Sequence, residues 1–441
     1  MDILIKNGII ITLGAKPRVL YNHSVFIEDG KIKSIDRNDA FTGIYDKVID
    51  AKGKVVMPGY INAHMHFYST LVRGLGKAAP SSNFKEVLEN LWWRLDKKLG
   101  HEDTYYSALI MALNAVRHGT TTLIDHHASP FAVKGSLNTI AKAVKETGLR
   151  ASLCYELSDR DCKKISDEGI EENAEFIKQC NDTNDEQLKA LFGLHAAFTL
   201  EDSTLEKASK IGNDLNAGFH VHVAEAESDE EHSLKNYRMR VVERLDKFGI
   251  LGNKSIAAHC VHVDEKEMDI LAENGTIVVH NPQSNLNNAV GIADIIKLQS
   301  KGILVGLGTD AMTVKMPEEL RVALWAQHIK NQNPSCGFVE AANTLLRNNA
   351  VIANKYWNVP LGAIEEGAAA DIILIDYYPP TPLDESTYTG HIIFGISHST
   401  VDTTIVNGKV LMENKVLKLG IDEEEVSRKS LETAKKLWDR F

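Results

Sequence analysis

Several histidines and acids of this 441-residue chain directly follow short apolar runs, a placement that can bind a metal ion. His64 and His66 end the segment MPGYINAHMH (57–66), and residues at this spacing in a strand point to the same side. A third candidate lies in HVHVAE (220–225), and a fourth, Asp310, ends VGLGTD (305–310). Imidazole nitrogens with one carboxylate suit Zn²⁺ or Fe²⁺. Each residue alone would be an ordinary polar strand terminus, but four on separate strand ends predict a metal site.

The segment between residues 59 and 360 alternates short apolar runs with stretches of helical length. The apolar runs include 119–125, 191–195, 218–224, 255–259, 276–280 and 303–310, and the amphipathic stretches include 264–274 and 288–301. This alternation predicts an α/β fold with a (β/α)₈ TIM barrel, whose active sites lie at the carboxyl ends of the strands, where the metal candidates stand. A doubly wound sheet is the alternative. It is disfavoured because no GxGxxG or GxxxxGK[ST] motif follows a strand.

Both ends of the chain are rich in strands. Asp29-Gly30 and Asn407-Gly408 stand between alternating segments and favour type I′ hairpin turns, because both turn positions need a positive φ. Neither end can close a sheet alone, so we expect residues 1–58 and 361–421 to form one composite β-sandwich beside the barrel of residues 59–360. Residues 422–441 predict a helix packed on the body, because acids crowd its start and basic residues its end.

Composition and charge argue against several classes of protein. The 60 acidic and 49 basic residues give a net charge of −11, which disfavours binding to nucleic acid. No apolar run approaches the ~18–20 residues of a membrane span, so we expect no membrane partner. The opening MDILIKNGII carries a Lys and lacks a small-residue cleavage site, and the five scattered cysteines include no CxxC pair. Both observations favour a cytoplasmic protein without disulfides.

Five motifs in a fixed order resemble the amidohydrolase superfamily. They are PGYINAHMH, HVHVAE, AAHCVH, HNPQSN and GLGTD, and the resemblance spans essentially the whole chain. Within the superfamily the motifs are most similar to the cyclic-amidine aminohydrolases and triazine chlorohydrolases, and among these to an aminohydrolase group associated with selenium metabolism. The motif set is specific for the superfamily and much less so for the substrate.

The resemblance implies roles for seven residues: metal ligation by His64, His66, His222 and Asp310, acid/base roles for Glu225 and His259, and substrate binding by His195. A bound cation lowers the pKa of its water from ~15.7 towards ~7. Asp310 would take the proton from that water, and His259 would hydrogen-bond the resulting hydroxide. Glu225 would protonate a ring nitrogen of the substrate and later pass a proton to the leaving amine.

The resemblance also bears on the number of ions and of subunits. Two-metal members of the superfamily carry a bridging Lys on the fourth barrel strand, and residues 191–197 contain no Lys. We therefore expect one divalent ion, Zn²⁺ in the first place and Fe²⁺ as the alternative. By analogy with relatives, we expect a homodimer.

A few further residues are weaker candidates. His280 begins HNPQSN, a loop that borders the pocket in relatives, and Trp92 could stack on a flat heterocycle. A packed role is the alternative for both. Asp125-His126-His127 ends another strand, where we expect scaffold hydrogen bonds, with substrate contact by one of the three as the alternative. We expect His220 to support the metal ligands. The acids that follow Glu225, between 227 and 231, are expected to be solvated on a loop.

The leading hypothesis is a metal-dependent aminohydrolase that hydrolyses a cyclic amidine C–N bond of a small heterocyclic substrate and releases ammonia. A chloride or alkylamine leaving group would use the same machinery. A non-catalytic accessory or scaffold protein of selenium metabolism is the alternative from another class, although such relatives typically lose ligands. A zinc deaminase of the cytidine type is excluded, because that chemistry uses P-C-x-x-C, which does not occur here.

Overall fold

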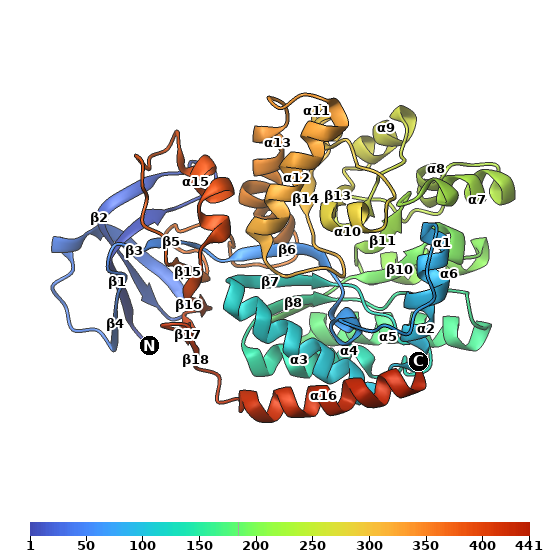
Figure 1. The fold of residues 1–441 in the computed structure, drawn as a ribbon, viewed down its shortest axis with the longest axis horizontal. Helices are drawn as coiled ribbons and strands as arrows, with labels where there is room; N and C mark the ends of the chain where they lie inside the picture. The colour runs from blue at the N-terminus through green and yellow to red at the C-terminus, as the bar shows by residue number, and fades with distance from the viewer. Residues whose placement is uncertain (184) are drawn as a thin grey trace.

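The computed structural model describes residues 1–183 and 185–441, and its larger part is a closed barrel with helices outside it (Figure 1). The barrel strands are β6 (Tyr60–Met65), β7 (Thr120–Asp125), β8 (Arg150–Leu153), β9 (Leu188–Ala190) with β10 (Phe192–Ala196), β11 (Phe219–Val223), β12 (Ile256–His259), β13 (Ile277–His280) and β14 (Val305–Leu307). All ladders between them are parallel. Since β9 and β10 are two halves of the fourth strand, and Met65 bridges to Asp310, the sheet closes on itself.

The helices between the barrel strands and after the last one follow the predicted alternation. They are α3 (His101–His118), α4 (Ser136–Thr147), α5 (Lys163–Thr183), α6 (Asp202–Asp214), α7 (Glu227–Tyr237), α8 (Val241–Lys247), α9 (Glu265–Glu273), α10 (Pro282–Asn287), α11 (Ile295–Ser300), α12 (Met316–Asn331), α13 (Phe338–Asn343) and α14 (Asn349–Ala353). The helical stretch expected over 288–301 is shorter, because Ala289 (φ 54°) and Gly291 (φ 116°) leave the helical region. No helix in the described part of the chain has the length and apolarity to cross a bilayer.

Strands from both chain ends form one nine-stranded sheet beside the barrel. Its order is β18 (Val416–Leu417), β17 (Lys409–Glu413), β16 (Val401–Val406), β15 (Ile372–Ile375), β5 (Val55–Pro58), β1 (Ile3–Ile11), β2 (Val19–Glu28) and β3 (Lys31–Arg37), with β4 (Lys47–Asp50) paired to β1. The sheet curls so that Gly30 accepts a hydrogen bond from the Ala370 N–H (2.9 Å), and isoleucines and valines fill its interior. This arrangement is the predicted β-sandwich.

Both predicted hairpins are present at the ends of this sheet. Glu28 pairs with Lys31 around one turn, and Val406 pairs with Lys409 around the other. The turn residues Asp29-Gly30 and Asn407-Gly408 all have φ between 49° and 78°. These values match the type I′ geometry that the sequence predicted.

The C-terminal helix α16 (Glu423–Arg440) lies along α3 on the outside of the barrel (Figure 1). Asp422 caps its first turn by accepting a hydrogen bond from the Glu425 N–H, and Leu437 is fully buried. Near the end of the helix, Trp438 Nε1 donates to the Leu71 carbonyl (2.7 Å). The predicted docking helix is therefore present, and its last turn reaches the segment that follows the first metal motif.

Candidate metal centre and active-site pocket

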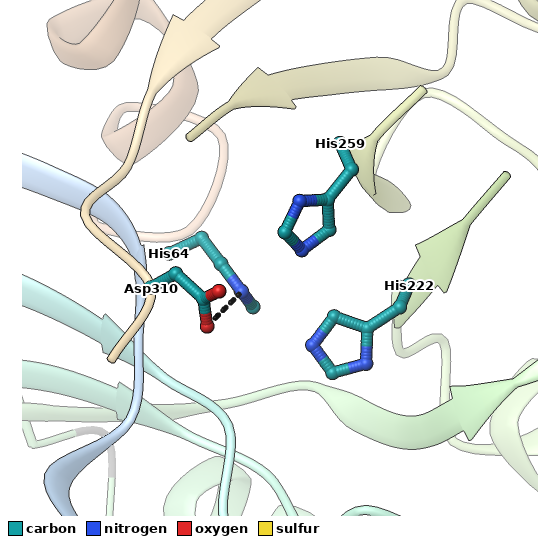
Figure 2. Close-up of side chains that lie close together, drawn as sticks. All are labelled: His64, His222, His259 and Asp310. Atoms are coloured by element: carbon teal, nitrogen blue, oxygen red, sulfur yellow. Dashed lines mark ion pairs between the residues drawn. The ribbon is translucent and has the colours of Figure 1, made fainter. Parts of the chain in front are cut away.

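The four predicted metal ligands lie at the carboxyl ends of barrel strands and face one another. His64 is on β6 and His66 directly follows it, while His222 is on β11 and Asp310 follows β14. His66 Nε2 lies 2.8 Å from Asp310 Oδ1 and 3.4 Å from His222 Nε2, and His64 Nε2 lies 3.6 Å from the same carboxylate oxygen. Figure 2 shows that His259, from β12, points into the same space. The structure thus brings together residues that are 246 positions apart between His64 and Asp310 (310 − 64).

The protein holds one ring nitrogen of these imidazoles and leaves the other for the centre. His66, His222 and His259 use Nδ1 to donate to the His126 carbonyl (2.5 Å), the His195 carbonyl (2.8 Å) and Asn285 Oδ1 (2.7 Å), respectively. A donating Nδ1–H fixes the tautomer in which Nε2 carries a lone pair. His64 Nδ1 shares a hydrogen bond with His220 Nε2 (2.8 Å), which agrees with the expected supporting place of His220.

This donor set fits a divalent cation. The ligand atoms of His64, His222, His259 and Asp310 all lie within 4.8 Å of one another. His64 Nε2 and His259 Nε2 are buried and lack a hydrogen-bond partner among the described residues, and such atoms cost about 1–3 kcal/mol each when nothing satisfies them. Three imidazole lone pairs and a carboxylate around a common point are ligands that zinc accepts. His66 contacts the same carboxylate, so five side chains surround the centre: these four and His66. The sequence predicts four ligands.

The backbone at the strand ends is strained where it directs these side chains. His259 (φ 75°), Asp310 (φ 52°) and Ala224 (φ 46°) occupy the left-handed region, which costs a non-glycine residue on the order of 1–3 kcal/mol. Ser284 Oγ donates a hydrogen bond to Asp310 Oδ2 and fixes that carboxylate. The fold holds these residues in costly conformations next to one another, as is common in functional sites.

Glu225 is a buried carboxyl group beside the metal centre. Its Oε1 accepts a hydrogen bond from Asn288 Nδ2 (3.3 Å), and its Oε2 lies 3.5 Å from His259 Nε2. Burial, and after it the nearby charges of Asp310 and Asp229, raise the pKa of Glu225 well above its ordinary value. A carboxyl group held protonated can give a proton to a substrate, which is the predicted role of this residue.

Two acids that follow Glu225 correct the sequence interpretation. Asp229 and Glu230 lie on α7 and are buried, with 6% and 4% exposure, rather than solvated on a loop. Asp229 Oδ2 accepts hydrogen bonds from the N–H groups of Glu225 (3.0 Å) and Ala226 (3.3 Å), so it caps the helix that begins there. Burial raises the pKa of Asp229 to about 7. Glu227 and Glu231 are exposed, as expected.

A pocket of about 700 Å³, partly open to solvent, leads to the metal centre. The metal-centre residues His66, His222, Glu225 and Asp310 form one part of its lining, and aromatic side chains form another: Tyr68, Phe84, Trp92, Trp93 and Phe198. Pockets lined by apolar and aromatic side chains with a few convergent polar groups typically bind small molecules.

The three predicted substrate contacts have different positions. His195 and Trp92 line the pocket. Burial lowers the pKa of His195 to about 3, so its ring is neutral. His280 is completely buried, and among the described residues it is not one of those that line the pocket. Substrate contact by His280 therefore stays a prediction.

Glu156 is a pocket residue that the sequence analysis missed. It lies three residues after β8 and its side chain is 3% exposed. Its Oε1 is 3.3 Å from His66 Nδ1 and 3.2 Å from His126 Nδ1, and its Oε2 is 3.9 Å from His195 Nε2. Burial opposes the ionisation of Glu156, but His126 and His66 outweigh it and hold the pKa well below its usual value. The available signal was one acid at the end of the apolar run RASLCYEL (150–157), a pattern too common to single it out.

Comparison with protein families and curated proteins places these features in context. The amidohydrolase family model matches residues 55–411. The chain is 34% identical over 421 residues to the 5'-deoxyadenosine deaminase of Methanobrevibacter smithii, covering 94% of this chain and 93% of that one. It is 34% identical over 423 residues to the 5-methylthioadenosine/S-adenosylhomocysteine deaminase of Thermococcus sibiricus, covering 93% and 94%. The nearer resemblance to selenium-associated aminohydrolases finds no support in these relatives and stays a prediction.

Solved structures share the whole architecture. An adenosine deaminase of Xanthomonas campestris with bound zinc superposes with a TM-score of 0.88 at 22% identity, over 99% of this chain and 98% of that one. An atrazine chlorohydrolase of Arthrobacter aurescens complexed with zinc gives 0.81 at 23% identity, over 98% and 100%. These likenesses confirm the predicted barrel with its composite sandwich. The family match and the relatives at 34% identity show that the chain belongs to the amidohydrolase family and is a metal-dependent aminohydrolase, as its motifs predicted.

Proposed function

We propose that this protein is a zinc-dependent deaminase of adenine nucleosides, of the kind that carry a small or thioether group at the 5' position. The observation that carries the proposal is the buried Glu225, whose pKa burial raises, beside a donor set that fits a metal ion at the end of an aromatic pocket. The two relatives at 34% identity are named for 5'-deoxyadenosine and for 5-methylthioadenosine and S-adenosylhomocysteine. Adenine contains the cyclic amidine that the predicted chemistry requires.

The proposed metal ligands are His64, His66, His222 and Asp310. When bound there, a divalent cation would lower the pKa of a water molecule. It would also stabilise the negative charge that develops on atoms bonded to the attacked carbon. We propose a single zinc ion, because β10 contains no Lys and Lys189, in the β9 half of the fourth strand, pairs with Glu186 (3.2 Å). The proton transfers of the reaction are carried out by side chains of the protein.

Three side chains would move or hold protons. Glu225 gives its proton to the purine nitrogen next to the attacked carbon, which makes that carbon more electrophilic. Asp310 accepts a proton from the attacking water, and His259, fixed by Asn285, hydrogen-bonds the oxygen as it attacks. Glu225, ionised by its first transfer, takes the proton of the added hydroxyl group and passes it to the exocyclic amine as the C–N bond breaks, so that a carbonyl forms and ammonia leaves. Asp310 then returns the proton it took from water, which restores Glu225 to its protonated state.

The walls of the pocket suit a flat heterocycle. Trp92 and Tyr68 pack edge to face with ring centroids 6.0 Å apart, and both line the pocket. Aromatic faces of this kind stack on purines.

We also propose that the chain divides into a sandwich of residues 1–58 and 361–421, a barrel of residues 59–360 and the helix of residues 422–441, and that the protein forms a homodimer.

The direct test is a panel assay for ammonia release with zinc-loaded protein. We expect turnover of 5'-deoxyadenosine, 5-methylthioadenosine or S-adenosylhomocysteine, and the matched control is the Asp310→Asn variant under the same loading. Atrazine in the same panel tests the chloride leaving group. If the wild-type protein contains zinc and releases ammonia from no adenine nucleoside, the proposal is wrong.

A further inference from the structure

Two side chains that line the pocket, Glu156 and His195, place polar atoms side by side: Glu156 Oε2 and His195 Nε2 lie 3.9 Å apart. The orientation of His195 follows from its neighbour Thr199. The Thr199 hydroxyl is positioned to donate to the Ala196 carbonyl (3.0 Å), and with that hydrogen bond in place its oxygen accepts from His195 Nδ1–H at 2.8 Å. The other ring nitrogen, Nε2, therefore presents a lone pair, and it is 3.9 Å from Glu156 Oε2.

The carboxylate of Glu156 is fixed in this orientation by its other oxygen. Oε1 is buried and lies 3.3 and 3.2 Å from the Nδ1 atoms of His66 and His126, within ion-pair distance but without a hydrogen bond among the described residues. His126 Nε2 donates to the His220 carbonyl (3.1 Å), so the imidazole that faces Glu156 is itself held in place. As a result, Oε2 cannot turn away from the pocket without breaking contacts on the opposite side.

We propose that Glu156 and His195 form an acceptor pair that recognises a second nitrogen donor of the substrate, an amino group or a ring N–H, in addition to the amidine that is hydrolysed. For a nitrogen placed ~2.9 Å from both acceptors, the angle acceptor–nitrogen–acceptor would be roughly 85°. The two N–H groups of one amine can donate hydrogen bonds across such an angle. The pair deepens the proposed deaminase function and rests on it. Glu156 is then a specificity-determining residue, because a ligand with only acceptors at this point leaves a buried carboxylate without a partner.

The test compares substrates that share the same reacting amidine. Adenosine and 2,6-diaminopurine riboside differ by one amino group, and 9-methyladenine and adenine differ by one ring N–H. We expect the wild-type protein to favour the donor-bearing member of at least one pair by about tenfold or more in kcat/KM. In Glu156→Leu this ratio should fall to within about twofold of one. An effect of the variant on metal affinity cancels in the ratio, because both members of a pair use the same centre.

Two further variants support the comparison. Glu156→Gln keeps the shape and one acceptor, so we expect an intermediate ratio even if Glu156→Leu fails to fold. Glu231→Leu makes the same change at an exposed position and should keep the wild-type ratio. A wild-type ratio near one in both pairs, or an unchanged ratio in both Glu156 variants, would overturn the proposal.

Binding measurements separate this proposal from the proposed function. If no compound is deaminated, the calorimetric affinities of purine riboside and 2-aminopurine riboside for the zinc protein still report the acceptor pair, with the same expected ratio.

Elemental analysis tests whether Glu156 instead binds a second metal ion, since His66, His126, Glu156 and His222 also place ligand atoms within 4.8 Å of one another. Two ions per wild-type chain and one per Glu156→Gln chain would assign Glu156 to a second metal and overturn substrate recognition.

Discussion

The two walls of the pocket are built by different means. The metal side is made of strand ends of the barrel, where parallel ladders fix the backbone beside His66, His222 and Asp310. The aromatic side is made of short helical turns, η2 (Phe67–Val72), α1 (Phe84–Val87), η3 (Leu88–Trp92), α2 (Trp93–Leu95) and η4 (Asp96–Lys98). Most of these turns have fewer than six residues and cannot be stable alone.

Contacts from the distant C-terminus hold the aromatic side in place. Trp438 donates to the Leu71 carbonyl, and Arg94 Nη2 donates to the Phe441 carbonyl (2.7 Å) while its guanidinium lies 4.2 Å from the Phe441 ring centroid. The comparison indicates that the chemistry is placed on the rigid strand ends of the barrel, whereas the stacking surface for the substrate is placed on a wall fixed by side-chain contacts. Substitutions on the first should change kcat, and substitutions on the second should change KM.

The largest effect is expected at Asp310. Asp310→Asn removes a proposed metal ligand and the base that accepts the water's proton, with almost no change of volume, so turnover should fall by at least about 10⁴-fold. Circular dichroism should show an intact fold. Ammonia release measures the activity, and zinc content per chain shows whether the ion is also lost. Activity within tenfold of wild type would remove Asp310 from the mechanism.

Glu225→Gln should give the next largest effect. The amide keeps the shape of the side chain and its contact with Asn288 but has no acidic proton to give, so kcat should fall by about 10²–10⁴-fold while zinc content stays the same. Glu227→Gln, at the exposed first residue of α7, two positions after Glu225, is the matched control and should behave as wild type. Unchanged kcat in the Glu225 variant would contradict its role as an acid.

The metal side was largely predictable from sequence, and the reason is local. A strand that carries His-x-His places both imidazoles on one side by its own geometry, and GLGTD puts an acid at a strand end without reference to other segments. The hairpins at Asp29-Gly30 and Asn407-Gly408 were predictable for the same reason, since the required positive φ is a property of the turn residues.

The aromatic side and the burial of polar groups were not predictable in this way. Asp229 is buried because it caps the helix that starts beside Glu225, which depends on where that helix begins. Glu156 matters through contacts with His66, His126 and His195, which come from three other barrel strands. Pairings across distant segments leave no spacing signal in one sequence.

A smaller effect is expected at Trp92, on the aromatic side. Trp92→Leu removes the edge-to-face contact with Tyr68 and a stacking face, a loss of about 0.5–1.5 kcal/mol, so KM should rise about two- to tenfold. The value of kcat should stay within about twofold, because the residue lies away from the metal ligands. Steady-state kinetics with 5'-deoxyadenosine measure both. A fall in kcat without a rise in KM would show that the two walls are not independent.

The smallest effect is expected at Trp438, which does not line the pocket in the described chain. Trp438→Phe keeps an aromatic ring but removes the hydrogen bond to the Leu71 carbonyl, worth about 0.5–1.5 kcal/mol. The aromatic wall should then open more often, and KM should rise about two- to threefold at constant kcat. Amide hydrogen exchange should accelerate in residues 67–98 and stay unchanged in the barrel strands. Trp325→Phe, at an indole 45% exposed on α12, is the matched control. Equal exchange rates in both variants would mean that the aromatic wall does not depend on the C-terminal helix. The two walls of the pocket would then differ in the elements that form them but not in what supports those elements.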